Sequence, residues 1–359
     1  MRGIPPSPAP PLLLTCLKML WFSVLLQGVS FAWAASGASH WTYEGAHGQE
    51  RWQETYPDCG REAQSPIDIQ TESVHYDPSL RPIEPEGYRS PGSEKLTLTN
   101  NGHTVQMSLP QTMRLHGLPK VYSAVQLHFH WGSQRHTEGS EHRVDGRAFP
   151  AEVHIVHFNS EKYANLSEAK HHADGLAVLG IFLEVGNSEN LAYSHIFDHL
   201  EDIEHAEQEI SLSPFNIRDL LPAHLGHFFR YNGSLTTPPC YQSVLWTVFH
   251  QTARISTDQL EKLQTSLYST EDDKTPELPL EDNFRRPQDL NRRLVFSSFP
   301  AAPSGYSAGK IVAIIFGVVL GCLILFLAGW IMARRIREKT IQDQKGVVFK
   351  SSSPRPPTD

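Results

Sequence analysis

Apolar and polar residues alternate over short stretches through most of the chain. Five segments show this pattern clearly, namely 95–99, 104–109, 124–131, 151–158 and 176–185. Alternation with a period of two is typical of β-strands, because successive side chains of a strand point to opposite faces. Glycine, proline, asparagine and aspartate separate the segments, as expected for turns. The pattern predicts one sheet-dominated domain over residues 38–300, with a few helices such as 190–200 and 257–268.

A continuous apolar segment stands near the C-terminus. Residues 311–333 contain no charged side chain, and about 20 apolar residues suffice for a helix to cross a bilayer. The residues that follow include four cations, Arg334, Arg335, Arg337 and Lys339. Clustered positive charge marks the cytoplasmic side of a membrane. We therefore predict a linker at 301–310, a transmembrane helix at 311–333 and a cytoplasmic tail at 334–359. The large domain is then extracellular, in a single-pass type I protein of the plasma membrane.

Two small residues within the apolar segment bear on its pairing. Gly317 and Gly321 form a GxxxG motif, which lets two membrane helices approach closely. Glycine is also frequent in membrane helices that do not pair, so the motif leaves a homodimer as one of two alternatives.

The N-terminus has the character of a secretory signal. Lys18 precedes an apolar stretch over 19–33, and small residues follow it at 34–37. This order predicts a signal peptide over residues 1–34, with an approximate cleavage site. Five prolines stand before the apolar stretch, which is unusual for such a signal. One hypothesis is that translation starts at Met19.

Charge and cysteine content narrow the class of protein. The 359 residues include 31 basic and 39 acidic side chains, for a net charge of -8. No basic excess is available for nucleic acid, so we exclude it as a partner. Cys16 lies in the predicted signal peptide and Cys322 in the predicted transmembrane helix, which leaves Cys59 and Cys240 in the domain. In an extracellular domain these two are expected to form a disulfide; the alternative is two free, buried thiols.

Histidines recur on two of the predicted strands. His128 and His130 are two residues apart, so both point to the same face of their strand. If a second strand over 151–157 pairs with the first, His154 completes a cluster of three. Three imidazoles leave the fourth position of a tetrahedral zinc ion open, which is typical of catalytic and not of structural zinc.

Two residues could orient these ligands through their second ring nitrogen. Gln126 and Glu152 precede His128 and His154 by two positions, so each shares a face with its histidine. His130 would need a backbone carbonyl instead. The spacing does not choose the ligands uniquely, because His157 and His103 lie nearby in the sequence.

Several motifs, in order along the chain, resemble the alpha-class carbonic anhydrases. They are QSPIDI at 64–69, NNGH at 100–103, QLHFHWG at 126–132, GSEH at 139–142, AEVHIVH at 151–157 and SLTTPPC at 234–240. The resemblance extends from about residue 40 to residue 292 and covers the whole predicted domain. The added membrane helix, basic tail and pair of cysteines resemble the single-pass membrane members of that family.

The resemblance implies a fold and an activity. The fold is mostly β (α+β), a single domain with a large, mainly antiparallel twisted sheet of about ten strands and peripheral helices. The activity is the zinc-dependent reversible hydration of carbon dioxide to bicarbonate and a proton at the outer cell surface. It would contribute to extracellular pH and bicarbonate balance, with bicarbonate or proton transporters as partners.

The resemblance also implies roles for single residues. His128, His130 and His154 match the zinc ligands. Thr236 matches a residue whose hydroxyl accepts a hydrogen bond from zinc-bound hydroxide and donates one to Glu141. The remaining matches are a proton shuttle at His103, a water-ordering hydroxyl at Tyr43, and a substrate pocket formed by Asn101, Gln106, Val156, Val178, Leu235, Thr237, Val244 and Trp246.

Modification signals and alternative functions complete the picture. Asn165 and Asn232 begin N-glycosylation sequons. The main alternative function is a non-catalytic carbonic-anhydrase-like ectodomain for adhesion or binding, although such domains typically lack one or more zinc histidines. A zinc peptidase of the HExxH type is disfavoured, because that motif does not occur in the sequence.

Overall fold

The computed structural model describes Gly3, residues 41–300 and residues 308–345. The chain divides into two compact units, 1–300 and 301–359, and we treat each by itself. The predicted signal peptide and the alternative start at Met19 lie outside the described residues. The same holds for most of the predicted linker and for the end of the predicted tail.

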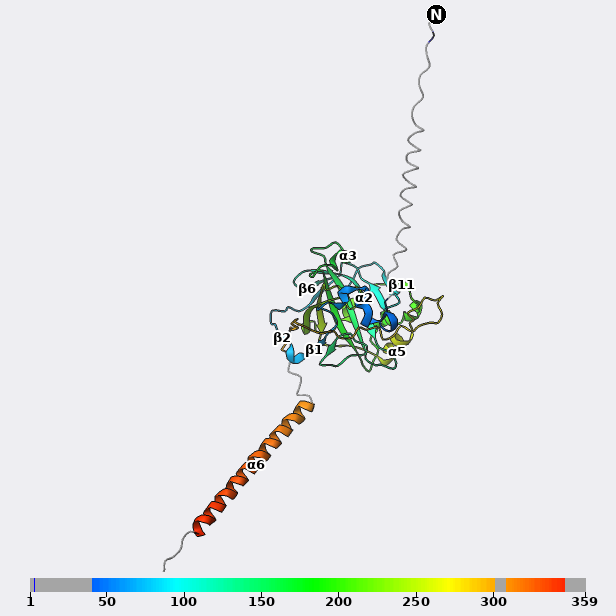
Figure 1. Ribbon diagram of the computed structural model, residues 1–359. Helices are drawn as coiled ribbons and strands as arrows, with labels where there is room; N and C mark the ends of the chain where they lie inside the picture. Colours follow the sequence, from blue (N-terminus) through cyan, green and yellow to red (C-terminus); the bar gives the residue numbers. More distant parts are fainter. Residues whose placement is uncertain (1–2, 4–40, 301–307, 346–359) are drawn as a thin grey trace, which may run out of the picture. The chain divides into compact units, whose positions relative to one another are not determined.

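A 13-stranded sheet runs through the first unit (Figure 1). Ten strands lie side by side in the order β11 (Glu209–Leu212), β4 (Leu96–Asn100), β5 (Val105–Ser108), β7 (Tyr122–Trp131), β9 (Ala151–Asn159), β10 (Leu176–Val185), β13 (Val244–Phe249), β12 (Phe228–Gly233), β15 (Phe296–Ser297) and β2 (His75–Tyr76). Three more strands attach to this path: β14 (Ala253–Ile255) to β10, β6 (Arg114–His116) to β7, and β3 (Glu84–Glu86) to β6. A separate parallel pair consists of β1 (Asp68–Ile69) and β8 (Arg143–Val144).

Most neighbouring strands are antiparallel, which confirms the predicted sheet. The exceptions within the large sheet are the parallel pairs β10–β13, β10–β14 and β15–β2. The sheet is therefore mixed, with antiparallel pairing around β7 and β9, where the histidines lie.

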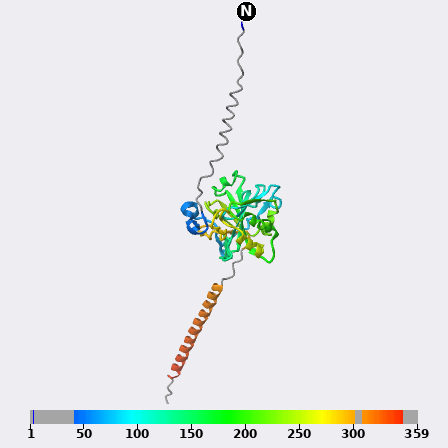
Figure 2. The ribbon, with the colours of Figure 1, turned by 90° about the vertical axis from the view of Figure 1, so that its right-hand side faces the viewer.

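Helices are few, short and peripheral. Among the described residues of the first unit, the α-helices are α2 (Trp52–Thr55), α3 (Leu166–Ala169), α4 (Leu191–Phe197) and α5 (Thr257–Thr265). The same residues contain six 3-10 turns: η1 (Gly45–His47), η2 (Gln49–Arg51), η3 (Pro57–Gly60), η4 (Thr71–Ser73), η5 (Leu200–Ile203) and η6 (Ile217–Leu220). Figure 2 shows the blue N-terminal turns at the edge of the domain. Both predicted helices are present but shorter; α5 begins at a capping box between Ser256 and Gln259 and ends before Tyr268, whose N–H donates to the carbonyl of Glu204.

The sheet separates two apolar cores, because alternate residues of its central strands point to opposite sides. In β9, Val153 and Ile155 belong to one core, which α4 and α5 cover. Val156 and Phe158 belong to the other core, on the side of α3. The sheet thus buries both of its faces, and any polar side chain on its central strands needs a partner within the protein.

The second unit contains one long helix. α6 (Ala308–Lys345) has 38 residues, so it is about 57 Å long. This exceeds the hydrocarbon core of a bilayer, which is about 30 Å thick. Val312–Ile341 is long and apolar enough to cross a membrane. The helix begins before the predicted segment 311–333 and continues through the basic residues that follow it.

Candidate metal centre

The register of three strands brings polar side chains onto one face of the sheet. In the antiparallel pair of β7 and β9, His128 lies opposite His154, and in the pair of β5 and β7, Gln106 lies opposite His128. Directly opposed residues point to the same face. A bulge at Ala124–Gln126 shifts the register of β7, and regular pairing continues from Gln126 onward. The three histidines therefore meet.

Each histidine is oriented by a hydrogen bond from one ring nitrogen. His128 Nδ1 lies 2.8 Å from Gln126 Oε1, and His154 Nε2 lies 2.8 Å from Glu152 Oε1. His130 Nδ1 lies 2.8 Å from the backbone carbonyl oxygen of residue 283. All three partners are acceptors, so each of these nitrogens carries the proton. The opposite nitrogens, Nε2 of His128 and His130 and Nδ1 of His154, present lone pairs.

These lone pairs converge, which tests whether a metal ion fits. One nitrogen from each histidine lies within 4.8 Å of the others, and His130 Nε2 is 3.1 Å from His154 Nδ1. Two nitrogens bound to one tetrahedral zinc at about 2.0–2.1 Å would be about 3.3 Å apart. Burial, and then the neighbouring histidines, lowers the pKa of His128 well below its usual range, and burial also lowers the pKa of His130. Neutral imidazoles with lone pairs aimed at one point suit a cation.

A buried carboxylate oxygen lies next to the point where the three histidines meet. Glu141 Oε2 is buried without a hydrogen-bond partner among the described residues. It lies 3.4 Å from His130 Nε2 and 3.7 Å from His154 Nδ1. An uncompensated buried carboxylate is costly, so the group fits the site of a divalent ion. The other oxygen, Oε1, accepts from the backbone N–H of Arg285 at 2.8 Å.

A second buried carboxylate orients two histidines at once. Glu152 Oε1 accepts from His154 and also lies 2.7 Å from His142 Nδ1, while Oε2 accepts from the backbone N–H of His142 at 2.8 Å. His142 Nε2 in turn lies 2.7 Å from the hydroxyl of Tyr231. Burial alone would raise the pKa of Glu152, but His142 and His154 hold it well below its usual value. Glu152 therefore stays ionised and fixes the ring of His154.

Asn283 is a supporting residue that the sequence did not reveal. Its carbonyl oxygen accepts from His130, and its Oδ1 accepts from the backbone N–H of Trp131 at 2.8 Å. Its Nδ2 donates to the carbonyl oxygens of His103 at 3.0 Å and Phe129 at 3.2 Å. Asn283 lies more than 150 residues from His130 in the sequence and in no regular element. Its supporting role can therefore be recognised only from its buried position in the tertiary structure.

A cavity of about 180 Å³ opens beside His128 and His154. The predicted pocket residues that line it are Val156, Val178, Leu235, Thr237 and Trp246, together with Gln126 and Thr236. Val156, Val178 and Trp246 form one row across β9, β10 and β13. Two further residues, Leu166 and Lys170, line the cavity although the sequence did not point to them. Val244 is not among the lining residues, although it lies on the same face of β13 as Trp246 and in the same apolar cluster.

The remaining predicted residues, Tyr43, Asn101, His103 and Gln106, are not among those that line this cavity. The ring of His103 stacks on Trp41, with centroids 3.8 Å apart and planes 8° from parallel. Asn101 Oδ1 accepts from the backbone N–H groups of His103 and Thr104, which fixes this turn. Burial, and then the charge of Glu141, raises the pKa of Tyr43 well above its usual value, so its hydroxyl stays protonated.

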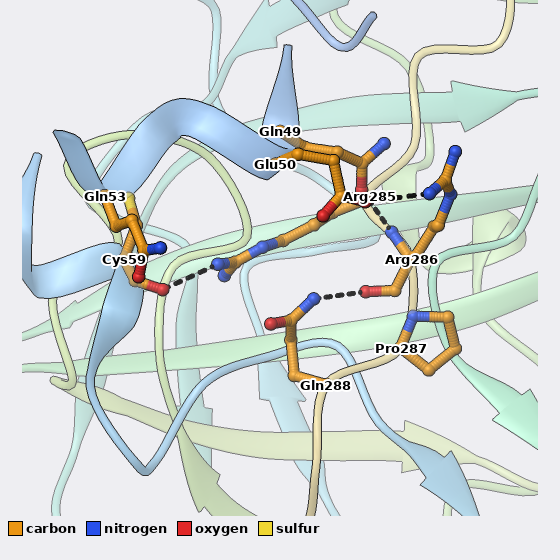
Figure 3. Close-up of a pocket in the computed structure, with 8 residues that line it drawn as sticks. All are labelled: Gln49, Glu50, Gln53, Cys59, Arg285, Arg286, Pro287 and Gln288. Atoms are coloured by element: carbon orange, nitrogen blue, oxygen red, sulfur yellow. Dashed lines mark hydrogen bonds and ion pairs between the residues drawn. The ribbon is translucent and has the colours of Figure 1, made fainter. Parts of the chain in front are cut away.

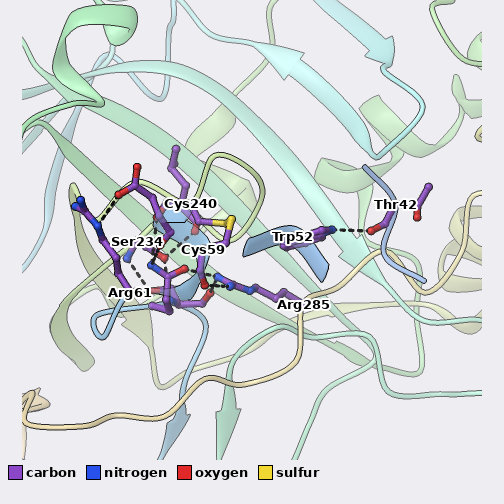
Figure 4. The surroundings of a disulfide bond; sticks show 11 residues. Thr42, Trp52, Cys59, Arg61, Ser234, Cys240 and Arg285 are labelled. Atoms are coloured by element: carbon purple, nitrogen blue, oxygen red, sulfur yellow. Dashed lines mark hydrogen bonds and ion pairs between the residues drawn. A yellow bond between two sulfur atoms is a disulfide. The ribbon is translucent and has the colours of Figure 1, made fainter. Parts of the chain in front are cut away.

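The loop that carries Thr236 is anchored on both sides. The structure contains the predicted disulfide between Cys59 and Cys240 (Figure 4). Ser234 exchanges hydrogen bonds with Ser65 at 2.9 and 3.0 Å, and its carbonyl accepts from Trp246 Nε1 at 3.0 Å. Thr236 is 5 % exposed. The hydrogen bond expected from Thr236 to Glu141 is not formed in the described part of the chain, since Glu141 Oε2 is turned toward the histidines.

A second cavity, of about 310 Å³, lies next to the disulfide (Figure 3). Arg285 donates there to Gln64 Oε1 at 2.8 Å and to the carbonyl of Cys59 at 3.0 Å. Arg286 pairs with Glu50 at 2.8 Å. Both arginines of this cavity already have partners within the protein. The cavity therefore offers no unpaired cation to a ligand, and its residues contribute to the surroundings of the disulfide.

Comparison with known proteins agrees with the geometry. The sequence profile of the eukaryotic-type carbonic anhydrase family matches residues 47–299. The chain is 42% identical to carbonic anhydrase 12 of Homo sapiens over 325 residues, covering 89% of this chain and 91% of that protein. It is 44% identical to carbonic anhydrase 6 of Homo sapiens over 270 residues, covering 74% and 85%. It is 41% identical to carbonic anhydrase 7 of Mus musculus over 271 residues, covering 74% and 100%.

The chain belongs to the eukaryotic-type, alpha-class carbonic anhydrase family. It is an enzyme of that class, a carbonic anhydrase, with an additional C-terminal helix apolar enough to anchor it in a membrane.

Proposed function

We propose that this carbonic anhydrase converts carbon dioxide and water to bicarbonate and a proton with one Zn²⁺ ion held by His128, His130 and His154. The proposal rests on the convergence of three imidazole lone pairs beside the unpaired oxygen of Glu141. Three protein ligands leave one position open for chemistry. When bound, zinc lowers the pKa of its water to about 7, which is the value established for carbonic anhydrases as a class.

The apolar wall receives the substrate. Carbon dioxide has no charge and no hydrogen-bond donor, so a surface of Val156, Val178 and Trp246 holds it while excluding bulk water. Leu235 extends this wall beside the histidines. The wall keeps carbon dioxide next to the open ligand position without binding it tightly.

Thr236 selects and orients the nucleophile. A threonine hydroxyl donates one hydrogen bond and accepts others. We expect it to donate to Glu141 Oε2, which has no other partner among the described residues, and to accept from the O–H of the attacking species. This arrangement favours a nucleophile that carries a proton. Thr237 lines the cavity next to it.

The proton leaves along the polar side of the site. Histidine has an unperturbed pKa of about 6.5, so it can take and release a proton near neutral pH. We assign this role to His103, with Tyr43, Asn101 and Gln106 ordering the water between cavity and solvent. Gln106 lies opposite His128 in the pairing of β5 and β7, which supports this role.

We further propose that the enzyme acts at the outer surface of the plasma membrane, where it contributes to extracellular pH and bicarbonate balance. Positive charge after the apolar segment of α6 supports a cytoplasmic C-terminus, and the disulfide supports an oxidising compartment. Asn165 and Asn232 are both exposed, as glycosylation requires. Among the single-pass membrane members, the stretches HWTYEG at 40–45 and RYNGSLTTPPC at 230–240 resemble isoform fourteen most. A homodimer and transporter partners remain predictions.

The test of the activity uses the full-length chain in detergent. Stopped-flow measurement of carbon dioxide hydration should show fast turnover with one zinc per chain. His154→Ala should lose the zinc and fall to the uncatalysed rate, because two histidines do not hold the ion. His199→Ala, at an exposed histidine, should retain both. Wild-type protein with one zinc per chain and no hydration activity would support the non-catalytic binding ectodomain instead.

The test of the orientation uses glycosylation in cells. Asn165→Gln and Asn232→Gln should each remove one glycosidase-sensitive step in gel mobility. A full-length protein without any glycan, with its C-terminus accessible outside intact cells, would reverse the proposed orientation.

A further inference from the structure

One cation lies in the wall of the catalytic cavity. Among the residues that line this cavity, Lys170 is the one with a lasting positive charge. The wall around it is formed by Leu166, Val156 and Val178. The charge of a lysine does not help to hold carbon dioxide, so the place of Lys170 beside this cavity calls for another explanation.

The short helix α3 fixes Lys170 in this place. Asn165 caps the helix by accepting from the backbone N–H of Glu168 at 3.0 Å, and the N–H of Lys170 donates to the carbonyl of Leu166 at 3.0 Å. Ala169 is fully buried and ties the helix to the core below. Leu166 and Lys170 are four residues apart, so they lie on the same side of the helical turn. That side lines the cavity.

The charge of Lys170 is not neutralised by its neighbours. Asp174 already pairs with Lys162 at 3.0 Å and with the hydroxyl of Tyr163 at 2.6 Å. Glu168 Oε2 accepts from the backbone N–H of Ala164 at 3.0 Å. In the described part of the chain, no carboxylate forms an ion pair with Lys170. Lys170 is half-buried and lines the cavity, so its positive charge acts on the cavity and its surroundings.

We propose that Lys170 makes this cavity a binding subsite for small monovalent oxyanions, with bicarbonate as the ligand that the enzyme itself supplies. The inference rests on the proposed function for the identity of that ligand. Bicarbonate meets a chain of net charge -8. The two charges of the proposed Zn²⁺ ion are offset by two buried carboxylates, Glu141 and Glu152, so the metal centre gives a monovalent anion little net attraction. A local cation at the cavity offsets this repulsion. Lys170 thus sets how tightly the product is held and how readily it enters in the reverse reaction.

The test compares two lysines of the same segment. Lys170→Met removes the charge at nearly constant length, and Lys170→Arg retains it. Lys162→Met removes the same net charge from an exposed site outside the cavity. For each full-length variant in detergent, sodium bicarbonate and sodium nitrate are titrated at low ionic strength. Two readouts follow: the inhibition constant against carbon dioxide hydration, and the rise of the melting temperature with anion concentration, which needs no turnover.

We expect Lys170→Met to weaken the binding of both anions about two- to fivefold at about 0.01 M ionic strength, where the screening length is about 30 Å. The difference should shrink at about 1 M of a salt whose ions are too bulky for the cavity, since the screening length falls to about 3 Å. Lys170→Arg should match the wild type, and so should Lys162→Met. Equal anion affinities for Lys170→Met and Lys162→Met at low ionic strength would overturn the inference.

The two readouts separate this inference from the proposed function. An active wild type whose anion affinity does not depend on Lys170 refutes only the subsite. An inactive wild type that still binds bicarbonate through Lys170 refutes the proposed activity and retains the subsite.

Discussion

The two faces of strand β9 carry one histidine each, in different surroundings. All nine residues of the strand are buried. On one face, His154 lies opposite His128 and is oriented by Glu152. On the other face, His157 contacts the hydroxyl of Tyr88 and lies 3.3 Å from the carbonyl oxygen of Ala177. Burial and residue type are the same for both histidines, so these two properties do not by themselves make a histidine a metal ligand. What decides is whether the free ring nitrogen meets other lone pairs or a single hydrogen-bonding partner.

Apart from the loss of a ligand itself, the largest expected effect of a change on the ligand face comes from removing the carboxylate that orients His154. Glu152→Ala should lower zinc affinity by about 10- to 100-fold, because His154 and His142 lose their shared acceptor. Competition with a chelator measures this affinity. Glu161→Ala, which removes an exposed carboxylate paired with Lys120, serves as the control and should bind zinc like the wild type. Unchanged zinc affinity in Glu152→Ala would show that strand geometry alone orients the ring.

A substitution on the other face of β9, which carries Ile155 and His157 and is called the core face below, should lower stability and leave metal binding unchanged. Ile155 is 0% exposed and lies between the two histidines in the sequence. Ile155→Ala should lower the free energy of unfolding by about 2–5 kcal/mol through lost burial and the cavity left behind. Denaturant unfolding of the domain, followed by tryptophan fluorescence, measures this loss. Leu191→Ala, at a side chain that is 75% exposed, should change stability by less than about 0.5 kcal/mol. A drop in the zinc affinity of Ile155→Ala would contradict the separation of the two faces.

The histidine of the core face should contribute to the pH dependence of stability. Burial lowers the pKa of His157 to about 3, whereas an unfolded histidine has a pKa of about 6.5. The unfolded chain therefore binds a proton first as the pH falls, so stability is complete above about pH 6.5 and declines toward pH 3. At pH 5 this one group should lower the free energy of unfolding by about 2 kcal/mol.

The variant His157→Gln isolates that contribution. The loss of unfolding free energy between pH 7 and pH 5 should be smaller in this variant than in the wild type by about 2 kcal/mol. His199→Gln changes an exposed histidine and should leave the difference as it is in the wild type. Equal losses in all three proteins would mean that His157 is protonated in the folded state.

The smallest effect concerns the glycine that faces His154 from β10. Gly180 lies opposite His154, and a Cβ atom there would stand 3.1 Å from Glu152 Oε1. Gly180→Ala should displace the carboxylate slightly, weaken zinc binding less than about tenfold and change stability by about 1 kcal/mol. Gly226→Ala, where the nearest atom would be 3.8 Å away, should leave zinc affinity unchanged. Chelator competition again decides, and a larger loss of zinc affinity than that of Glu152→Ala would contradict the expected ranking of the two variants.

Local pattern predicted much of the site because its parts follow strand geometry. The two-residue spacing placed Gln126 with His128, and Glu152 with His154, on common faces, and both hydrogen bonds are present. It could not supply the roles of Thr236 and Val244, which only the family resemblance implied. These depend on how the loop at 234–240 and strand β13 pack against segments far away in the sequence.

The sequence by itself determined the strand periodicity, the pairing of ligand and acceptor within each strand, the two cysteines left to bond, and an apolar segment long enough for a membrane. Each of these follows from neighbouring residues or from composition. Strand spacing left open whether His154 or His157 faces His128, and only the family resemblance indicated His154. The tertiary structure decided this, and it alone showed that the carbonyl of Asn283 holds His130 and that Lys170 lines the cavity. The reason is the register of β7 and β9, because a slip of one residue would exchange the faces of β9. The chain between these strands does not fix this register. It is fixed by the packing of both strands in a sheet that is buried on its two faces.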